Sequence, residues 1–278
     1  MNNNENKISP IGVFDSGFGG LSILREIRRV LPQYDYVFLG DNARAPYGTR
    51  SFQLVYEFTL QAVKYLFDQG CQLVILACNT ASAKALRTIQ QCDLPLIDPS
   101  RRVLGVIRPT VEAVGEISST GHIGVFGTPG TIASDSYNIE ITKLYPSFKV
   151  FGHACPMWVP LVENCESDGD GADYFVKKDV DGLLAMSDDI DTVILGCTHY
   201  PLLLNKIEKY TPAGVNVVAQ GDIVAHSLED YLHRHPEMDN RCSKGGTCRY
   251  LTTDDAAKFS SMASIFVNDE VNATKIKL

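Results

Sequence analysis

The sequence lacks the long hydrophobic run that a membrane-spanning helix requires. None of its apolar stretches reaches the length of about eighteen residues that such a helix needs. The N-terminal segment Met1–Asn6 is polar, whereas a secretory signal peptide has an apolar centre. We therefore expect a cytoplasmic protein that does not have a membrane as a partner.

Long runs of basic residues are also missing. The longest are the pairs Arg28–Arg29, Arg101–Arg102 and Lys177–Lys178, and the formal net charge is −8. Binding to nucleic acid or to an anionic membrane requires a clustered basic face. We therefore expect no nucleic acid among the partners.

Cysteine is too sparse for a disulfide framework. The eight cysteines are spread over 278 residues, and the reducing cytosol would keep them as thiols. Each thiol therefore needs its own explanation. For four of them we expect the role of a small buried apolar side chain, namely for Cys71, Cys92, Cys155 and Cys165.

A convincing zinc motif is missing too. The nearest candidate combines His233 and His235 with Cys242 and Cys248, but five residues separate the two cysteines, more than in the usual zinc knuckle. We favour surface positions on a C-terminal helix and loop for these residues. The sequence therefore predicts no bound metal.

Short apolar segments rich in β-branched residues alternate with longer amphipathic segments. This alternation predicts an α/β fold with mostly parallel sheets covered by helices. The expected strands are Ile11–Phe14, Tyr36–Leu39, Leu73–Ala77, Ile123–Phe126, Val193–Leu195 and Val215–Ala219. The expected helices are Leu21–Val30, Ser51–Phe67, Thr80–Gln90, Val103–Ile117, Thr131–Leu144 and Tyr174–Met186.

Two strand-like tetrapeptides each occur twice. Ile-Gly-Val-Phe stands at positions 11 and 123, an offset of 112 residues. Ile-Leu-Ala-Cys at position 75 returns as Ile-Leu-Gly-Cys at position 194, an offset of 119 residues. Either pair alone would be dismissed as chance, but two pairs in the same order and at similar spacing indicate two similar α/β units.

Polar or reactive residues follow all four of these repeated strands. Ligands of open parallel sheets bind at the carboxyl ends of the strands, so two such ends that face each other would enclose a small ligand. Cys78 and Cys197 follow the second tetrapeptide of each unit, just before a segment expected to begin a helix. The exposed N–H groups and the dipole of a helix favour a thiolate, so we expect a lowered thiol pKa.

Asp15 and His199 are the remaining candidates for proton chemistry. Asp15 ends the first strand and brings a carboxylate to its rim, with the N-cap of the following helix as the alternative role. His199 lies two residues after Cys197 and could assist that thiol near neutral pH, although a lone histidine is more often structural. Gly17 and Gly19 give only a weak nucleotide signal, because Ser22 replaces the third glycine of that motif.

With these residues in view, the sequence closely resembles the glutamate racemases of the aspartate/glutamate racemase superfamily, from about Ile11 to about Asp230. The resemblance to the family is loose from Pro236 to Leu278. The matching segments are Gly12–Leu21, Gly40–Asp41, Ala45–Gly48, Ala77–Ser82, Gly127–Ile132, Cys155–Glu163 and Leu195–Leu202.

The resemblance implies two pseudo-twofold-related α/β domains with mostly parallel central sheets and the active site in the cleft between them. The first domain would comprise residues 10–98 plus 212–278 and carry Asp15 and Cys78. The second would comprise residues 99–211 and carry Glu163 and Cys197. The implied activity is racemisation of L-glutamate to D-glutamate for peptidoglycan, without a cofactor. The oligomeric state stays open, with a homodimer as one candidate.

The resemblance also implies roles for single residues. Cys78 and Cys197 would be the acid–base pair, with Asp15, Glu163 and His199 as further catalytic residues. Glutamate would be held by Asp15, Ser16, Pro46, Tyr47, Gly48, Asn79, Thr80, Thr128, Thr131, Thr198 and His199.

Three alternatives stay open at this point. An aspartate racemase would share the paired cysteines and differ in pocket length. A cysteine hydrolase would use one thiol as a nucleophile with His199 as its base. A protein that only binds amino acids or cell-wall precursors would need the polar strand ends, but it would leave both cysteine-bearing repeats unexplained.

Overall fold

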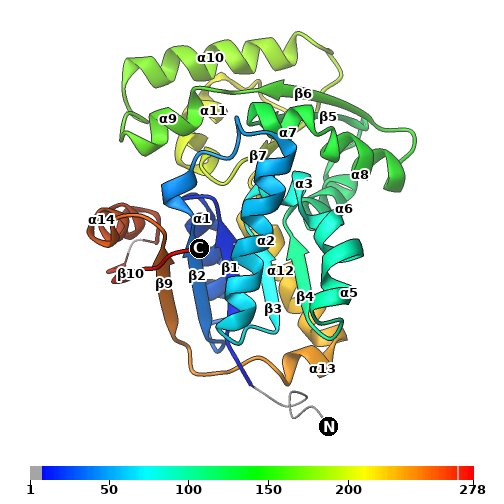
Figure 1. Ribbon diagram of the computed structural model, residues 1–278. Coiled ribbons are helices and arrows are strands. Elements are labelled where there is room, and N and C mark those ends of the chain that lie inside the picture. The colour runs from blue at the N-terminus through cyan, green and yellow to red at the C-terminus, as the bar shows by residue number, and fades with distance from the viewer. Residues whose placement is uncertain (1–7, 268) are drawn as a thin grey trace.

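The chain forms two parallel β-sheets covered by helices (Figure 1). The computed structural model describes residues 8–267 and 269–278. The first sheet has the order β10-β9-β2-β1-β3-β4 and the second has the order β6-β5-β7-β8. The first sheet contains β1 (Ile11–Asp15), β2 (Tyr36–Gly40), β3 (Leu73–Leu76), β4 (Arg102–Gly105), β9 (Cys248–Thr252) and β10 (Ala273–Lys275). The second contains β5 (His122–Gly127), β6 (Lys149–Ala154), β7 (Thr192–Gly196) and β8 (Asn216–Val218).

The two sheets repeat one connectivity. The order β2-β1-β3-β4 in the first sheet matches the order β6-β5-β7-β8 in the second, and every pair is parallel. The two Ile-Gly-Val-Phe segments lie in β1 and β5. The two cysteine-bearing segments lie in and just after β3 and β7. The predicted α/β class and the predicted repeat of strands are therefore confirmed.

Alternate residues of the strands pack on opposite faces of the first sheet. Ile11 and Val13 of β1 belong to the core on the side of α1, α12 and α14, whereas Phe14 packs toward α2 on the other side. The longer helices are α1 (Gly20–Val30), α2 (Phe52–Asp68), α6 (Ile107–Ile117), α8 (Ser136–Leu144), α10 (Asp170–Leu184), α12 (Gln220–Arg234) and α14 (Ala256–Val267). Shorter ones are α3 (Asn79–Lys84), α4 (Leu86–Thr88), α5 (Leu94–Ile97), α7 (Pro129–Ala133), α9 (Trp158–Glu163), α11 (Leu204–Tyr210) and α13 (Pro236–Asp239).

Three predicted helices are wrong in part. The segment expected to be a helix from Val103 begins instead as β4, because its backbone pairs with β3, and α6 starts only at Ile107. The helix expected over Thr80–Gln90 is broken at Ala85 and continues as a π-helical segment. The helix expected over Thr131–Leu144 is divided by Asp135, whose φ of 56° is left-handed.

Two strands lie on the far side of the expected domain boundaries. β4 pairs with β3 in the first sheet, although it follows residue 98, and β8 pairs with β7 in the second sheet, although it follows residue 211. The chain therefore passes from the first sheet to the second after residue 105 and returns to the first sheet after residue 218. The division into two domains itself stays a prediction.

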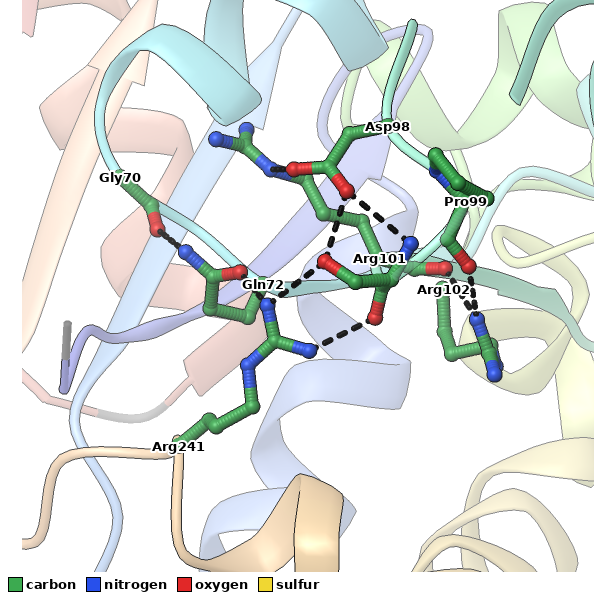
Figure 2. Close-up of polar contacts among 8 residues, drawn as sticks. Gly70, Gln72, Asp98, Pro99, Arg101, Arg102 and Arg241 are labelled. Carbon is green, nitrogen blue, oxygen red and sulfur yellow. Dashed lines mark hydrogen bonds and ion pairs between the residues drawn. The ribbon is translucent and has the colours of Figure 1, made fainter. Parts of the chain in front are cut away.

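The C-terminal segment is attached to the first sheet through β9 and through the residues that precede β9. β9 pairs with β2 along its whole length, and Ser9 forms a bridge to Cys242. Arg241 donates to the carbonyl of Ser100 at 2.7 Å and to the side-chain oxygen of Gln72 (Figure 2). This segment, whose resemblance to the family is loose, therefore completes the sheet. The expected surface loop positions are wrong for Cys242, which is buried, and for Cys248, which lies in β9.

The cysteine predictions are confirmed only in part. Cys71 and Cys155 are buried as expected, whereas Cys92 and Cys165 are exposed, so that prediction is wrong for these two. Cys165 stands at a turn after α9, with a left-handed φ of 58°. Across residues 8–267 and 269–278, no group of three or more histidine, cysteine, aspartate or glutamate side chains is arranged to hold a metal ion. In the same residues, no helix is both long and apolar enough to cross a membrane.

Candidate active site

Asp15 stands at the end of β1 with its carboxylate fully buried. Its Oδ2 atom accepts a hydrogen bond from the Gly17 amide at 2.9 Å, while Oδ1 has no partner among the described residues. Burial raises the pKa of this carboxyl, against the opposing effect of nearby His199. The N-cap of α1 is Gly19, so the N-cap alternative for Asp15 does not hold.

Cys78 follows β3 and caps α3. Its Sγ atom accepts from the Ala81 amide at 3.4 Å, and its thiol donates to Oγ of Ser16 at 3.4 Å. The expectation of a lowered pKa is wrong here. Burial, followed by the charge of Asp15, raises the pKa of Cys78 to about 12 and outweighs the contributions of Ser16 and Ala81.

Cys197 occupies the equivalent place after β7 and has a different neighbour. Its Sγ atom lies 3.8 Å from Nδ1 of His199, and Nε2 of His199 lies 3.1 Å from Oε1 of Glu163. Burial alone would lower the pKa of His199, but the hydrogen bonds to Cys197 and Glu163 outweigh it and raise that pKa to about 10. The imidazole is therefore charged at neutral pH beside the Cys197 sulfur.

The turn after β1 lies directly against the segment after β7. A Cβ atom on Gly19 would stand 2.2 Å from Oγ1 of Thr198 and 2.4 Å from Nδ1 of His199. Ser22 adds a bond from its hydroxyl to the Thr198 carbonyl at 2.9 Å. The ends of β1 and β7 are thus brought together, and glycine is required at position 19 for this close approach.

Threonine hydroxyls join the segment after β3 to the segment after β5. Oγ1 of Thr80 lies 3.0 Å from that of Thr128 and 3.1 Å from that of Thr131. The Gly130 amide donates to the Gly48 carbonyl at 2.7 Å, which brings a loop after β2 to the same place. The structure therefore gathers the strand ends of both sheets around the two thiols.

Comparison with known proteins identifies the family to which this arrangement belongs. The family model for Asp/Glu/hydantoin racemases matches residues 11–228. The chain belongs to the Asp/Glu/hydantoin racemase family. A glutamate racemase of Ruegeria sp. (strain TM1040) is 41% identical in an alignment of 271 residues that covers 94% of this chain and 97% of that protein.

Solved structures of this racemase family have the same fold. Glutamate racemase isoform RacE1 from Bacillus anthracis has a TM-score of 0.89 at 34% identity and covers 98% of both chains. Glutamate racemase from Francisella tularensis, solved in complex with D-glutamate, has a TM-score of 0.86 at 32% identity and likewise covers 98% of both chains. As a member of a racemase family, the chain is an isomerase.

The loop that carries Pro46, Tyr47 and Gly48 is held by Asp41, which was not among the predicted site residues. The buried carboxylate of Asp41 accepts from the Tyr47 hydroxyl, from Nε of Arg44 at 2.6 Å and from Oγ1 of Thr253. The peptide bond before Pro46 is cis. Asp41 stands in a family motif of the sequence, and that motif was the one signal that could have pointed to it.

Asn79 is held by residues that the sequence did not indicate. Its amide donates to Oε1 of Gln220 at 2.7 Å, and its oxygen accepts from the Tyr137 hydroxyl at 2.6 Å. All three side chains are buried. The predicted ligand Asn79 is therefore bonded on both polar atoms to other parts of the chain.

A cavity of about 830 Å³ lies beside this site and contains neither thiol. It is lined by residues of α3, α6, α8 and α12, among them Lys84, Arg108 and Glu140. The two thiols themselves are almost closed off, with exposures of 5% for Cys78 and 6% for Cys197. The chemistry is therefore to be sought at the strand ends and not in this cavity.

Proposed function

We propose that the chain interconverts L- and D-glutamate by moving the α-proton between Cys78 and Cys197, without a cofactor. The observation that carries the proposal is the position of the two thiols, one after β3 and one after the equivalent strand β7. The glutamate racemases to which the chain is similar support the choice of substrate. The inferred physiological role is supply of D-glutamate for peptidoglycan in the cytoplasm.

Inversion of the α-carbon requires a base on one face and an acid on the other. One thiolate takes the proton from Cα, and the electron pair of the broken C–H bond stays on carbon as a carbanion next to the carboxylate. The other thiol then gives its own proton to the opposite face. Two similar units that face each other supply this geometry, whereas a single base would return the proton with retention.

The unequal neighbours of the thiols suit unequal tasks. The imidazole of His199 faces the sulfur of Cys197, and Glu163 bonds to the other nitrogen of that ring. Cys78 has the Ser16 hydroxyl and lies in the field of Asp15. An ammonium group bound at Oδ1 of Asp15 would offset that negative charge and make the Cys78 thiolate easier to form.

The carbanion has no electron sink, so oriented donors in a closed pocket have to stabilise it. The threonine cluster and the neighbouring loops offer such donors from both sheets. We propose that substrate is held by Asp15, Ser16, Pro46, Tyr47, Gly48, Asn79, Thr80, Thr128, Thr131, Thr198 and His199. The two sheets with their helices would be the two domains around it, and pairing into a homodimer belongs to the same proposal.

The decisive experiment follows the optical rotation of L-glutamate incubated with purified protein after dialysis against a chelator and treatment with a carbonyl reagent. We expect full activity on glutamate and poor activity on aspartate. Faster racemisation of aspartate would overturn the choice of substrate. Activity that returns only with added zinc or pyridoxal phosphate would overturn the cofactor-free chemistry.

A further inference from the structure

Three buried side chains close a ring of hydrogen bonds beside the two cysteine-bearing segments. Asn79 donates to Oε1 of Gln220 at 2.7 Å, Gln220 donates to the Tyr137 hydroxyl at 2.8 Å, and Tyr137 donates to Oδ1 of Asn79 at 2.6 Å. Burial raises the pKa of the Tyr137 phenol, so the hydroxyl stays a donor at neutral pH. Each member therefore both gives and accepts one bond in the ring.

The ring touches the chain next to each cysteine. Asn79 directly follows Cys78 and is the first residue of α3. The Tyr137 ring packs against Gly196, which precedes Cys197, because a Cβ atom on Gly196 would lie 3.2 Å from Cε2 of Tyr137. One side of the ring thus borders the Cys78 segment and the other borders the Cys197 segment.

Gln220 fixes the ring to a third part of the chain. It is the first residue of α12, directly after the segment that leaves β8. Its amide also donates to Oγ1 of Thr110 on α6 at 2.8 Å. Elements associated with both sheets are therefore joined at this one side chain.

We propose that Gln220 and Tyr137 are positioning residues that set the separation of Cys78 and Cys197 through Asn79. The inference rests on the proposed two-thiol racemisation. Removal of the proton from one face of Cα and prompt protonation of the other face require both sulfur atoms at reacting distance at once, and small misplacements of reacting groups cost large factors in rate. Loss of one ring member leaves buried polar atoms without partners and lets the two segments shift.

The test uses two substitutions, each with a matched control elsewhere in the fold. Tyr137→Phe removes one hydroxyl from the ring, and its control is Tyr36→Phe, which removes a buried hydroxyl bonded to the Leu31 carbonyl at 2.7 Å. Gln220→Met breaks the ring at its centre. Its control is Gln72→Met, at a buried glutamine that bonds to Gly70 and Arg241 (Figure 2). Gln72 precedes β3, whereas Cys78 follows it.

The readout that separates positioning from stability is the fate of the α-proton in heavy water. A carbanion that is not promptly protonated by the second thiol lives long enough for the S–H of the first thiol to exchange with solvent. Return from that thiol then gives the starting enantiomer with deuterium at Cα. We expect both ring variants to lose at least about tenfold in kcat/KM. We expect the ratio of deuterium exchange in recovered substrate to inversion to rise in both. The two control variants should lower only the melting temperature, with that ratio unchanged.

Two outcomes would overturn the inference while the wild-type protein racemises glutamate. One is an unchanged exchange-to-inversion ratio in Tyr137→Phe, the milder variant, which decides the question if Gln220→Met does not fold. The other is an equal rise of the ratio in the control variants. Failure of the wild-type protein to racemise glutamate would instead refute the proposed function, so the two failures are distinguishable.

Discussion

Nε2 of His199 lies 3.1 Å from Oε1 of Glu163, and the other nitrogen of the same ring faces the sulfur of Cys197. The raised pKa of His199, about 10, means that the imidazole contributes stability that is fully present below its ordinary pKa of 6.5. That contribution is lost as the pH rises through about 10. The same deprotonation removes the positive charge beside Cys197.

Glu163→Gln is expected to move the alkaline limb of racemisation to lower pH. The substitution removes the carboxylate that helps to hold the proton on His199, so the pKa of the imidazole falls, by about one pH unit for the loss of one close opposite charge. The check is kcat/KM with L-glutamate between pH 6 and pH 11, beside an NMR titration of the ring. An alkaline limb identical to that of the wild type would show that Glu163 does not act on His199.

Asp15→Asn is expected to stabilise the fold while it abolishes most activity. The carboxyl is fully buried, and its Oδ1 has no partner among the described residues, so removal of its charge relieves a desolvation cost on the order of 1 kcal/mol. Such a gain corresponds to a rise of a few degrees in melting temperature. At the same time the proposed anchor for the substrate ammonium is lost, so we expect kcat/KM to fall by a factor of about one hundred or more.

The pH dependence of this gain has a definite sign. Because the pKa of Asp15 is raised above 3.8, the wild-type protein loses stability as the pH rises and the buried group ionises. The advantage of Asp15→Asn in melting temperature should therefore be largest near pH 8 and shrink toward pH 4. Asp35→Asn serves as the contrasting control, because hydrogen bonds from Thr247 lower the pKa of Asp35, and we expect its loss to destabilise the protein without a change in activity.

Gly19→Ala is expected to lower turnover through a steric clash, without removal of any polar group. The added methyl group would stand within 2.4 Å of atoms of Thr198 and His199, so the segment after β7 has to move. We expect kcat to fall by about one hundredfold, the cost of a displacement near 1 Å. Gly171→Ala is the matched control, since a Cβ atom there meets nothing within 4 Å, and near-normal kinetics are expected from it. Equal kinetics of the two variants would show that the Gly19 contact is unimportant.

Much of the site was predictable because it lies at the ends of strands with strong local patterns. The runs before Asp15, Cys78 and Cys197 are short, apolar and repeated, and each ends in a residue with obvious chemistry. Asp15 and Cys78 lie beside each other because they follow neighbouring parallel strands, β1 and β3, whereas Cys197 reaches them from the second sheet. Local pattern and tertiary position agree at these places.

The rest depends on contacts that no local pattern carries. β6 was missed because Gly152 and His153 interrupt its apolar run, and its residues are only half-buried or exposed at the edge of the sheet. The bonds of the Asn79 ring join residues 58, 83 and 141 positions apart. The pKa of Cys78 was predicted in the wrong direction because the helix end is visible in the sequence, whereas the burial that outweighs it is not.

The last prediction concerns the direction in which each thiol acts. By resemblance to the family, Cys78 should deprotonate D-glutamate and Cys197 should deprotonate L-glutamate, so each thiol starts the reaction of one enantiomer and completes that of the other. In heavy water the product should therefore carry solvent deuterium at Cα, while recovered substrate stays largely protiated at early times. Cys78→Ala and Cys197→Ala should each abolish racemisation in both directions, because the remaining thiol can start or finish the transfer but cannot do both. Mass spectrometry of the separated enantiomers measures these quantities directly. Substantial racemisation by either variant would refute the paired-thiol mechanism and favour a cysteine hydrolase or a different second base, since one thiol would then be dispensable.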